Sequence, residues 1–207
     1  MNFFHAEERK VYQRESENII RKLTGASKVI SSIGSVIRRS ERSPRFGQDG
    51  STVPGRFVHC DYSAAPEGSS FWVRKLLPAE EADHLLSQRY AIYNIWRVLS
   101  SPPQDTPLAV CDVRSVLADE RVGADCVVDA PDDPGFRSEL SVFRYSRNHR
   151  WIYFPGMTRE EVLVFKGYDS DPHRTGGVPH VAFDDPSCQA GAPPRESIDV
   201  RMIAFFG

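Results

Sequence analysis

His59 and Asp61 stand two positions apart in Arg56-Phe-Val-His-Cys-Asp-Tyr62, a run whose residues favour a β-strand. Residues i and i+2 of a strand project from the same face, so the imidazole and the carboxylate would lie side by side. With one more histidine they would fill three positions on one face of an Fe(II) ion and leave three positions for a co-substrate and O2. A His-X-Asp pair alone is a weak signal.

Two histidines further along the chain are candidates for the third ligand, His149 and His180. His180 follows a proline in a predicted strand near the C-terminus, and Arg195-Glu-Ser197 comes shortly after it. This order favours His180. His149 is then expected to contact substrate or to orient a carboxylate, although a plain packing or capping role is equally compatible with its position.

Arg195 and Ser197 are a candidate anchor for a carboxylate. A guanidinium binds a carboxylate through two parallel hydrogen bonds, and a hydroxyl two residues away on a strand would assist it. The order His-X-Asp, His, Arg-X-Ser is that of the enzyme superfamily that uses 2-oxoglutarate. Arg201 shares the parity of Arg195 and is expected to point the same way. The alternative is that Arg195 forms an ordinary surface ion pair with Glu196 or a loop acid.

The elements that must hold these residues are mostly short strands. The sequence predicts helices at 5–24 and 78–88, a basic loop at 38–55, a surface excursion at 119–137, and strands at 27–37, 56–62, 90–99, 107–116, 139–145, 149–154, 160–168, 178–183 and 196–206. A hairpin or meander is expected between 90–99 and 107–116, and a hairpin between 139–145 and 149–154. The predicted fold is mainly β with flanking helices, around a double-stranded β-helix (jelly roll, cupin-like) core.

The composition fits one globular domain over residues 1–207. Hydrophobic residues make up 40% and charged residues 26%, and the net charge of −2 gives no support for nucleic acid or an acidic membrane as the main partner. No apolar run is long enough to span a bilayer, and no signal peptide is apparent. The four cysteines are far apart in sequence, which fits a reducing compartment. The expected location is the cytoplasm, and the oligomeric state is left open.

Several segments together resemble one known family. They are Val58-His-Cys-Asp-Tyr62, Asn94-Ile-Trp-Arg97, Pro107–Val116, Asn148–Phe154, Glu161–Lys166, Tyr168-Asp-Ser170, Pro179–Pro186 and Pro194–Arg201. In these segments the chain resembles the AsaB-type hydroxylase/desaturase family of secondary metabolism, which includes gibberellin-desaturase-like and cephamycin-methoxylase-like proteins. Family members usually carry a longer segment before the helix at 5–24, so this chain is expected to be short at its N-terminus relative to the family.

The resemblance implies an Fe(II)- and 2-oxoglutarate-dependent oxygenase that uses O2 to hydroxylate or desaturate an unactivated C–H bond of a small natural-product intermediate. The implied metal ligands are His59, Asp61 and His180. Residues on the co-substrate side are Arg195, Ser197, Arg201 and Asn94, and the expected substrate pocket contains Arg97, His149, Trp151 and Tyr153. Trp96, Phe154 and Phe183 are further candidates for its lining, although aromatic residues more often pack in a core.

Two other functions fit the same residues. One is a cupin-type metal dioxygenase that needs no 2-oxoglutarate, which succinate formation would distinguish. The other is a shortened, non-catalytic paralogue that serves as a partner of another tailoring enzyme. The presence of His59, Asp61, His180 and Arg195 together counts against this second function. Zinc is a lesser alternative to iron, because the same ligands suit it.

Overall fold

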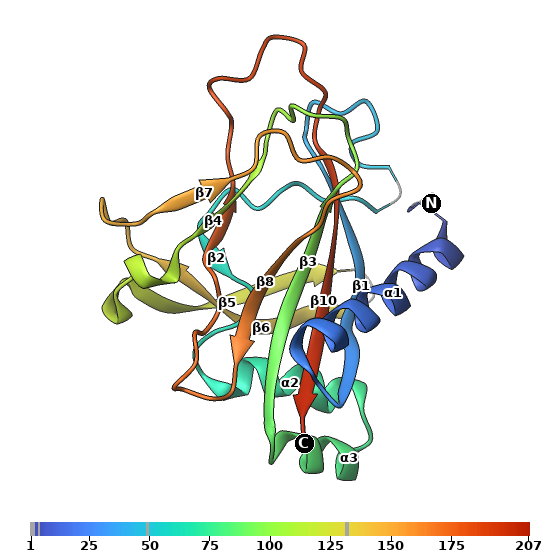
Figure 1. The fold of residues 1–207 in the computed structure, drawn as a ribbon, viewed down its shortest axis with the longest axis vertical. Coiled ribbons are helices and arrows are strands. Elements are labelled where there is room, and N and C mark those ends of the chain that lie inside the picture. The colour runs from blue at the N-terminus through green and yellow to red at the C-terminus, as the bar shows by residue number, and fades with distance from the viewer. Residues whose placement is uncertain (1–2, 4, 49, 131–132) are drawn as a thin grey trace.

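The computed structural model describes residue 3 and residues 5–48, 50–130 and 133–207. Its strands form two antiparallel sheets that face each other across a shared apolar core (Figure 1). The first sheet has the order β1 (Lys28–Arg39), β10 (Glu196–Phe206), β3 (Arg89–Val98) and β8 (Leu163–Asp169). The second has the order β5 (Arg121–Ala130), β6 (Asp133–Phe143), β2 (His59–Cys60), β9 (His180–Ala182), β4 (Leu108–Cys111) and β7 (Trp151–Tyr153).

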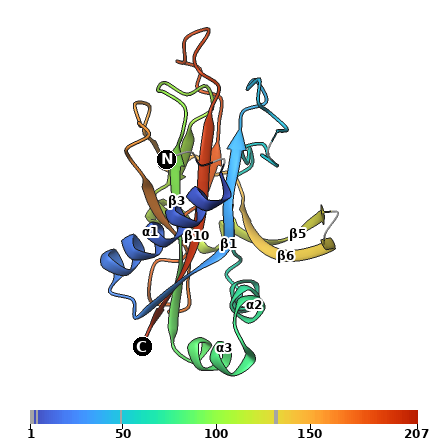
Figure 2. The same ribbon diagram turned by 90° about the vertical axis from the view of Figure 1, so that its right-hand side faces the viewer.

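This topology confirms the predicted double-stranded β-helix. The chain alternates between the sheets, so β1, β3, β8 and β10 belong to one sheet while β2, β4, β7 and β9 belong to the other. Eight strands that alternate in this way form a jelly roll. The β5–β6 hairpin is an insertion that extends the second sheet beyond β2 and projects from the body of the molecule (Figure 2).

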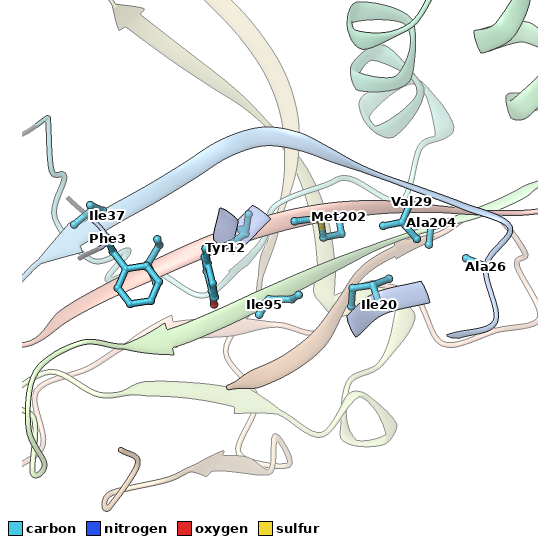
Figure 3. Packing of buried hydrophobic residues seen from close by; sticks show 11 residues of the cluster. Phe3, Tyr12, Ile20, Ala26, Val29, Ile37, Ile95, Met202 and Ala204 are labelled. Atoms are coloured by element: carbon cyan, nitrogen blue, oxygen red, sulfur yellow. The ribbon is translucent and has the colours of Figure 1, made fainter. Parts of the chain in front are cut away.

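Helix α1 (Ala6–Thr24) lies across the outer face of the first sheet (Figure 2). Its buried residues Tyr12 and Ile20 pack against Ile95 of β3 and Met202 of β10 (Figure 3). The helix ends at Gly25, whose φ of 72° is left-handed backbone that glycine adopts without steric cost. Because alternate residues of β10 face α1, the others face the space between the sheets.

Two further helices close one end of the space between the sheets. Helix α2 (Pro66–Leu76) and helix α3 (Ala79–Leu86) pack with Tyr62, Tyr90 and Phe205 in a second core. Helix α3 was predicted, but α2 was not, because Gly68 and two serines give its first turns low helix propensity. A Cβ atom at Gly68 would lie 2.9 Å from Ser63 Oγ and 3.3 Å from the carbonyl oxygen of Glu139 in β6, so this glycine allows α2 to approach β6 closely.

Both predicted hairpins are wrong. Strand β3 pairs with β10 and β8, whereas β4 pairs with β9 and β7 in the opposite sheet. Likewise β6 pairs with β5 and β2, and β7 pairs with β4. Turn-like residues between two strands suggest a direct hairpin, but in a jelly roll the same linkers carry the chain across to the other sheet.

Within the described residues, most of the surface excursion expected at 119–137 belongs to the projecting β5–β6 hairpin, so the strand residues there were not predicted from the sequence. The acidic and proline-rich composition of the segment favours a loop, although apolar residues alternate along β5 at Val122, Ala124, Cys126, Val128 and Ala130. Two predicted strands are shorter than expected. The strand at 56–62 is reduced to β2, and the strand at 107–116 ends with β4 before a 3-10 helix at Val113–Ser115.

The remaining predicted elements are confirmed with small shifts of their ends. They are the helix at 5–24 and the strands at 27–37, 90–99, 160–168, 178–183 and 196–206. Among the described residues, no helix combines the length and the apolar character needed to cross a bilayer.

Candidate metal centre and co-substrate cavity

Three of the predicted ligands meet on the inner face of the second sheet. His59 of β2 and His180 of β9 are direct partners across these two strands, and their ring centroids are 4.3 Å apart. Asp61 follows β2 immediately. Its carboxylate oxygens lie 3.9 Å from His59 Nε2 and 3.8 Å from His180 Nε2. The ligand atoms of the three residues all lie within 4.8 Å of one another.

Each imidazole is held in the tautomer that a metal ligand needs. His59 Nδ1 lies 2.8 Å from the carbonyl oxygen of Phe57, and His180 Nδ1 lies 3.0 Å from that of Val178. A carbonyl can only accept, so both Nδ1 atoms donate and both Nε2 atoms keep a free lone pair. Burial lowers the pKa of His59 to about 4 and also lowers the pKa of His180. Both rings are therefore neutral at physiological pH, as metal binding requires.

Asp61 is held by two residues from the opposite sheet. Asn94 Nδ2 donates to Asp61 Oδ2 at 2.6 Å, and Arg201 Nη2 lies 2.7 Å from Asp61 Oδ1. Asn94 and Arg201 are themselves direct partners across β3 and β10. Burial alone would raise the pKa of Asp61, but Arg201, the two imidazoles and Asn94 outweigh it and hold this pKa below its ordinary value. The carboxylate is therefore charged and fixed in orientation.

The donor set fits Fe(II). Two neutral imidazole nitrogens and one carboxylate oxygen, brought to one side of a common point, are the ligands of the facial triad of non-heme iron oxygenases. The outer hydrogen bonds to Phe57, Val178, Asn94 and Arg201 resemble those that orient ligands in known metal sites. The same atoms also suit Zn(II).

Arg195 is buried beside this centre and its guanidinium is fixed on three sides. Its Nε donates to Ser197 Oγ at 3.1 Å, and its Nη1 donates to the carbonyl oxygen of Thr106 at 3.0 Å. The guanidinium carbon lies 5.1 Å from the centre of the Trp96 ring. Burial, followed by the charge of Arg38, lowers the pKa of Arg195 to about 9, so the group stays cationic at neutral pH. No carboxylate is within ion-pair distance of its side chain among the described residues.

One cavity connects the imidazoles with Arg195. Its lining is formed by Arg38, Gly55, His59, Asn94, Trp96, Leu108, Phe165, His180, Ala182, Arg195, Asp199 and Arg201. Among these described residues, four carry buried polar atoms that lack a hydrogen-bond partner, namely Asn94 Oδ1, Trp96 Nε1, Asp199 Oδ1 and Arg201 Nε. Buried polar atoms are normally paired, so this cluster indicates a place for a polar ligand or ordered water.

Gly55 leaves room for the His59 ring. A Cβ atom at position 55 would lie 2.9 Å from His59 Cε1, closer than side chains pack. The Gly55 backbone is fixed because its carbonyl oxygen accepts from the Ala182 amide at 2.8 Å. We therefore expect Gly55→Ala to displace the ring and to weaken metal binding by roughly 10–100-fold, the effect of disturbing the support of a ligand. Titration with Co(II), followed by its d–d absorption, measures this loss.

The matched control for that variant is Gly156→Ala. A Cβ atom at Gly156 would meet no atom within 4 Å, and its backbone does not require glycine. The control is expected to bind Co(II) as the wild type does. Equal affinity of the two variants would contradict the assigned role of Gly55.

Of the predicted substrate-pocket residues, Trp96 lines this cavity, whereas Arg97, His149, Trp151 and Tyr153 do not. Arg97 faces α1, where its guanidinium carbon lies 5.1 Å from the centre of the Tyr12 ring. His149, Trp151 and Tyr153 line a groove on the outer face of the second sheet, opposite the triad. The register explains this placement, because Tyr153 pairs with Ala109 while the inward-facing His180 pairs with Val110. His149 Nε2 instead contacts Glu120 Oε2 at 2.8 Å.

Six residues of the cavity lining were not found from the sequence as site residues, namely Arg38, Gly55, Leu108, Phe165, Ala182 and Asp199. Arg38 was assigned to a basic loop but lies in β1, and Gly55 and Asp199 carried no pattern of their own. Burial raises the pKa of Asp199. The parity of Asp199 with Arg195 and Arg201 along β10 is the one signal that could have identified it.

Comparison with known proteins agrees with this geometry. A family model described as an oxidoreductase/YMDC permease-like domain matches residues 2–205. The Fe(II)/2-oxoglutarate-dependent dioxygenase nvfI of Aspergillus novofumigatus is 34% identical over 191 residues, which cover 91% of this chain and 64% of that protein. The hydroxylase/desaturase asaB of Aspergillus flavus is 32% identical over 198 residues, which cover 86% of this chain and 87% of that protein.

A solved structure also has this fold. The iron and alpha-ketoglutarate-dependent endoperoxidase NvfI superimposes with a TM-score of 0.80 at 29% identity, covering 95% of this chain and 69% of that one. The chain spans less than two thirds of the length of the curated nvfI sequence, at 64%.

Proposed function

The chain belongs to the AsaB-type hydroxylase/desaturase family, and from this premise we propose that it is an Fe(II)- and 2-oxoglutarate-dependent oxygenase. Its proposed reaction is hydroxylation or desaturation of an unactivated C–H bond in a small secondary metabolite. The observation that carries the proposal is the single cavity that joins two free imidazole Nε2 atoms to a buried Arg195–Ser197 pair.

His59, Asp61 and His180 would hold the iron. When bound, Fe(II) supplies the activation of O2 that couples oxidation of 2-oxoglutarate to succinate and CO2 with oxidation of the substrate. The residues of the chain set the geometry in advance. The carbonyl oxygens of Phe57 and Val178 fix the imidazoles, so the ligands lose little freedom on binding the metal.

Arg195 and Ser197 would bind the carboxylate of 2-oxoglutarate that lies far from the metal. Arg195 is already oriented by Thr106, Ser197 and Trp96, so an incoming carboxylate meets a guanidinium that does not have to be ordered. Trp96, Leu108 and Phe165 surround the same cavity with apolar surface and limit the access of water to it. Exclusion of water strengthens the electrostatic contacts of the co-substrate.

Anaerobic titration of the protein with Fe(II) and then 2-oxoglutarate tests this function. We expect a weak visible charge-transfer band that saturates at one 2-oxoglutarate per iron, and succinate production once O2 is admitted. Protein loaded with Zn(II) is the control, because a d¹⁰ ion gives no such band. Absence of the band from the iron-loaded protein would contradict the proposal, and substrate oxidation without succinate would favour the cupin-type dioxygenase. The natural-product class of the substrate and a cytoplasmic location stay predictions.

A further inference from the structure

Arg38 lies beside the proposed carboxylate anchor. It belongs to β1, and its direct partner across the strands is Ser197 of β10. Directly paired residues of an antiparallel ladder share a face, and their Cβ atoms are about 4.5–5.5 Å apart. Arg38 therefore faces the space between the sheets next to the Arg195–Ser197 pair, and it lines the same cavity.

The charge of Arg38 is not balanced by a carboxylate. Its Nη1 donates to Thr52 Oγ1 at 3.1 Å and to the carbonyl oxygen of Val53 at 2.9 Å, and both acceptors are neutral. No acidic side chain lies within ion-pair distance of Arg38 among the described residues. The neighbouring Arg39, on the other face of β1, has such a partner in Glu196 at 3.1 Å.

The cavity as a whole has more cationic than acidic groups. Arg38, Arg195 and Arg201 line it, whereas Asp199 is the one acidic residue among the described residues of its lining. Arg201 is already engaged by Asp61. The indole Nε1 of Trp96 is a buried donor without an acceptor in the same cavity. The excess of cationic groups and the unpaired indole N–H favour an anionic ligand, and one that carries more negative charge than a single guanidinium would bind.

We propose that Arg38 is the second cation of the co-substrate anchor, and that it binds, with Arg195 and Ser197, the far carboxylate of a dicarboxylic 2-oxo acid. The inference rests on the proposed function and adds the residue that selects the co-substrate. A five-carbon 2-oxo acid without the second carboxylate would chelate the same metal but would gain nothing from Arg38. The site thus discriminates 2-oxoglutarate from 2-oxopentanoate through two guanidinium groups.

Anaerobic titration of Fe(II)-loaded protein with each of these two acids tests the proposal, with the charge-transfer band as the readout. Arg38→Met is expected to weaken 2-oxoglutarate binding by roughly 10–100-fold, the size of one hydrogen bond to a charged group. It should leave 2-oxopentanoate binding unchanged. Arg38→Lys, which keeps the charge, should recover part of the loss. Arg147→Met is the matched control, since Arg147 is exposed and distant in sequence from the cavity residues.

Affinity for Co(II) in the absence of any 2-oxo acid separates binding from support of the fold. Arg38 contacts Thr52 and Val53, which precede Gly55, so a purely structural role would lower Co(II) affinity and weaken both acids equally. That result, or unchanged 2-oxoglutarate binding in Arg38→Met, would overturn the proposal while leaving the proposed function intact. If the iron-loaded wild type binds neither acid, the proposed function and this inference fail together.

Discussion

We expect His180→Ala to reduce the affinity of the protein for Fe(II) or Co(II) by more than about 100-fold, and His149→Ala to leave that affinity unchanged. Loss of a group that only orients a ligand typically costs 10–100-fold, and loss of the ligand itself should cost more. His180 Nε2 lies 3.8 Å from an oxygen of Asp61 on the inner face of the second sheet. His149 lies on the outer face of that sheet, where its Nε2 is 2.8 Å from Glu120 Oε2.

Equilibrium titration with Co(II), read by absorption and confirmed by competition with a chelator of known affinity, measures both variants. Thermal unfolding in the absence of metal shows whether each variant is folded. A His180→Gln variant keeps a polar group of similar size and guards against a loss caused only by the cavity that alanine leaves. If His149→Ala abolished metal binding while His180→Ala did not, the assignment of the third ligand would be wrong.

The sequence predicted the residues that a short motif and strand parity place together. His59 and Asp61 share a face through their i, i+2 spacing, and the alternation of β10 places Ser197, Asp199 and Arg201 on one side. The order of His180 and Arg195 along the chain was enough to select His180 over His149. These inferences needed only local geometry and the order of motifs.

The residues that were misplaced depend on pairing between distant strands. Tyr153 and Trp151 alternate correctly along β7, but the face they occupy is set by the register of β7 against β4, which the sequence does not show. A one-residue change in the register of a strand moves each of its side chains to the opposite face of the sheet. Arg38 was missed for another reason, because it was assigned to the loop at 38–55 whereas β1 continues to Arg39.

Arg201→Met is expected to lower the free energy of unfolding of the metal-free protein by about 3–5 kcal/mol, the cost of leaving one partner of a buried ion pair without the other. The side chains of Arg201 and Asp61 are only 14% and 8% exposed, and Asp61 Oδ1 lies 2.7 Å from Arg201 Nη2. Burial opposes the charged form of Arg201, but the carboxylates of Asp61 and Asp199 raise its pKa above the ordinary value. In the variant, Asn94 is the one hydrogen-bond partner that Asp61 keeps among the described residues.

Urea unfolding of the metal-free protein measures this loss, and the same substitution at Arg174 is the matched control. Arg174 forms an exposed ion pair with Asp171 at 3.2 Å, and such pairs contribute at most about 1 kcal/mol. Arg201→Met and Arg174→Met therefore remove the same groups from buried and exposed surroundings. Equal losses of stability in the two variants would contradict the view that Arg201 compensates the charge of Asp61.

A second substitution identifies the source of the loss. Asp61→Asn in the Arg201→Met background removes the uncompensated charge, so the double variant should be more stable than Arg201→Met alone. A bound divalent cation would supply the missing positive charge in another way, and Zn(II) should therefore raise the unfolding midpoint of Arg201→Met toward that of the wild type. If Asp61→Asn gave no recovery, the loss would come from the packing of the Arg201 side chain or from Asp199, whose Oδ2 lies 3.4 Å from Arg201 Nη2, and Asp61 would need no counter-charge in the absence of metal.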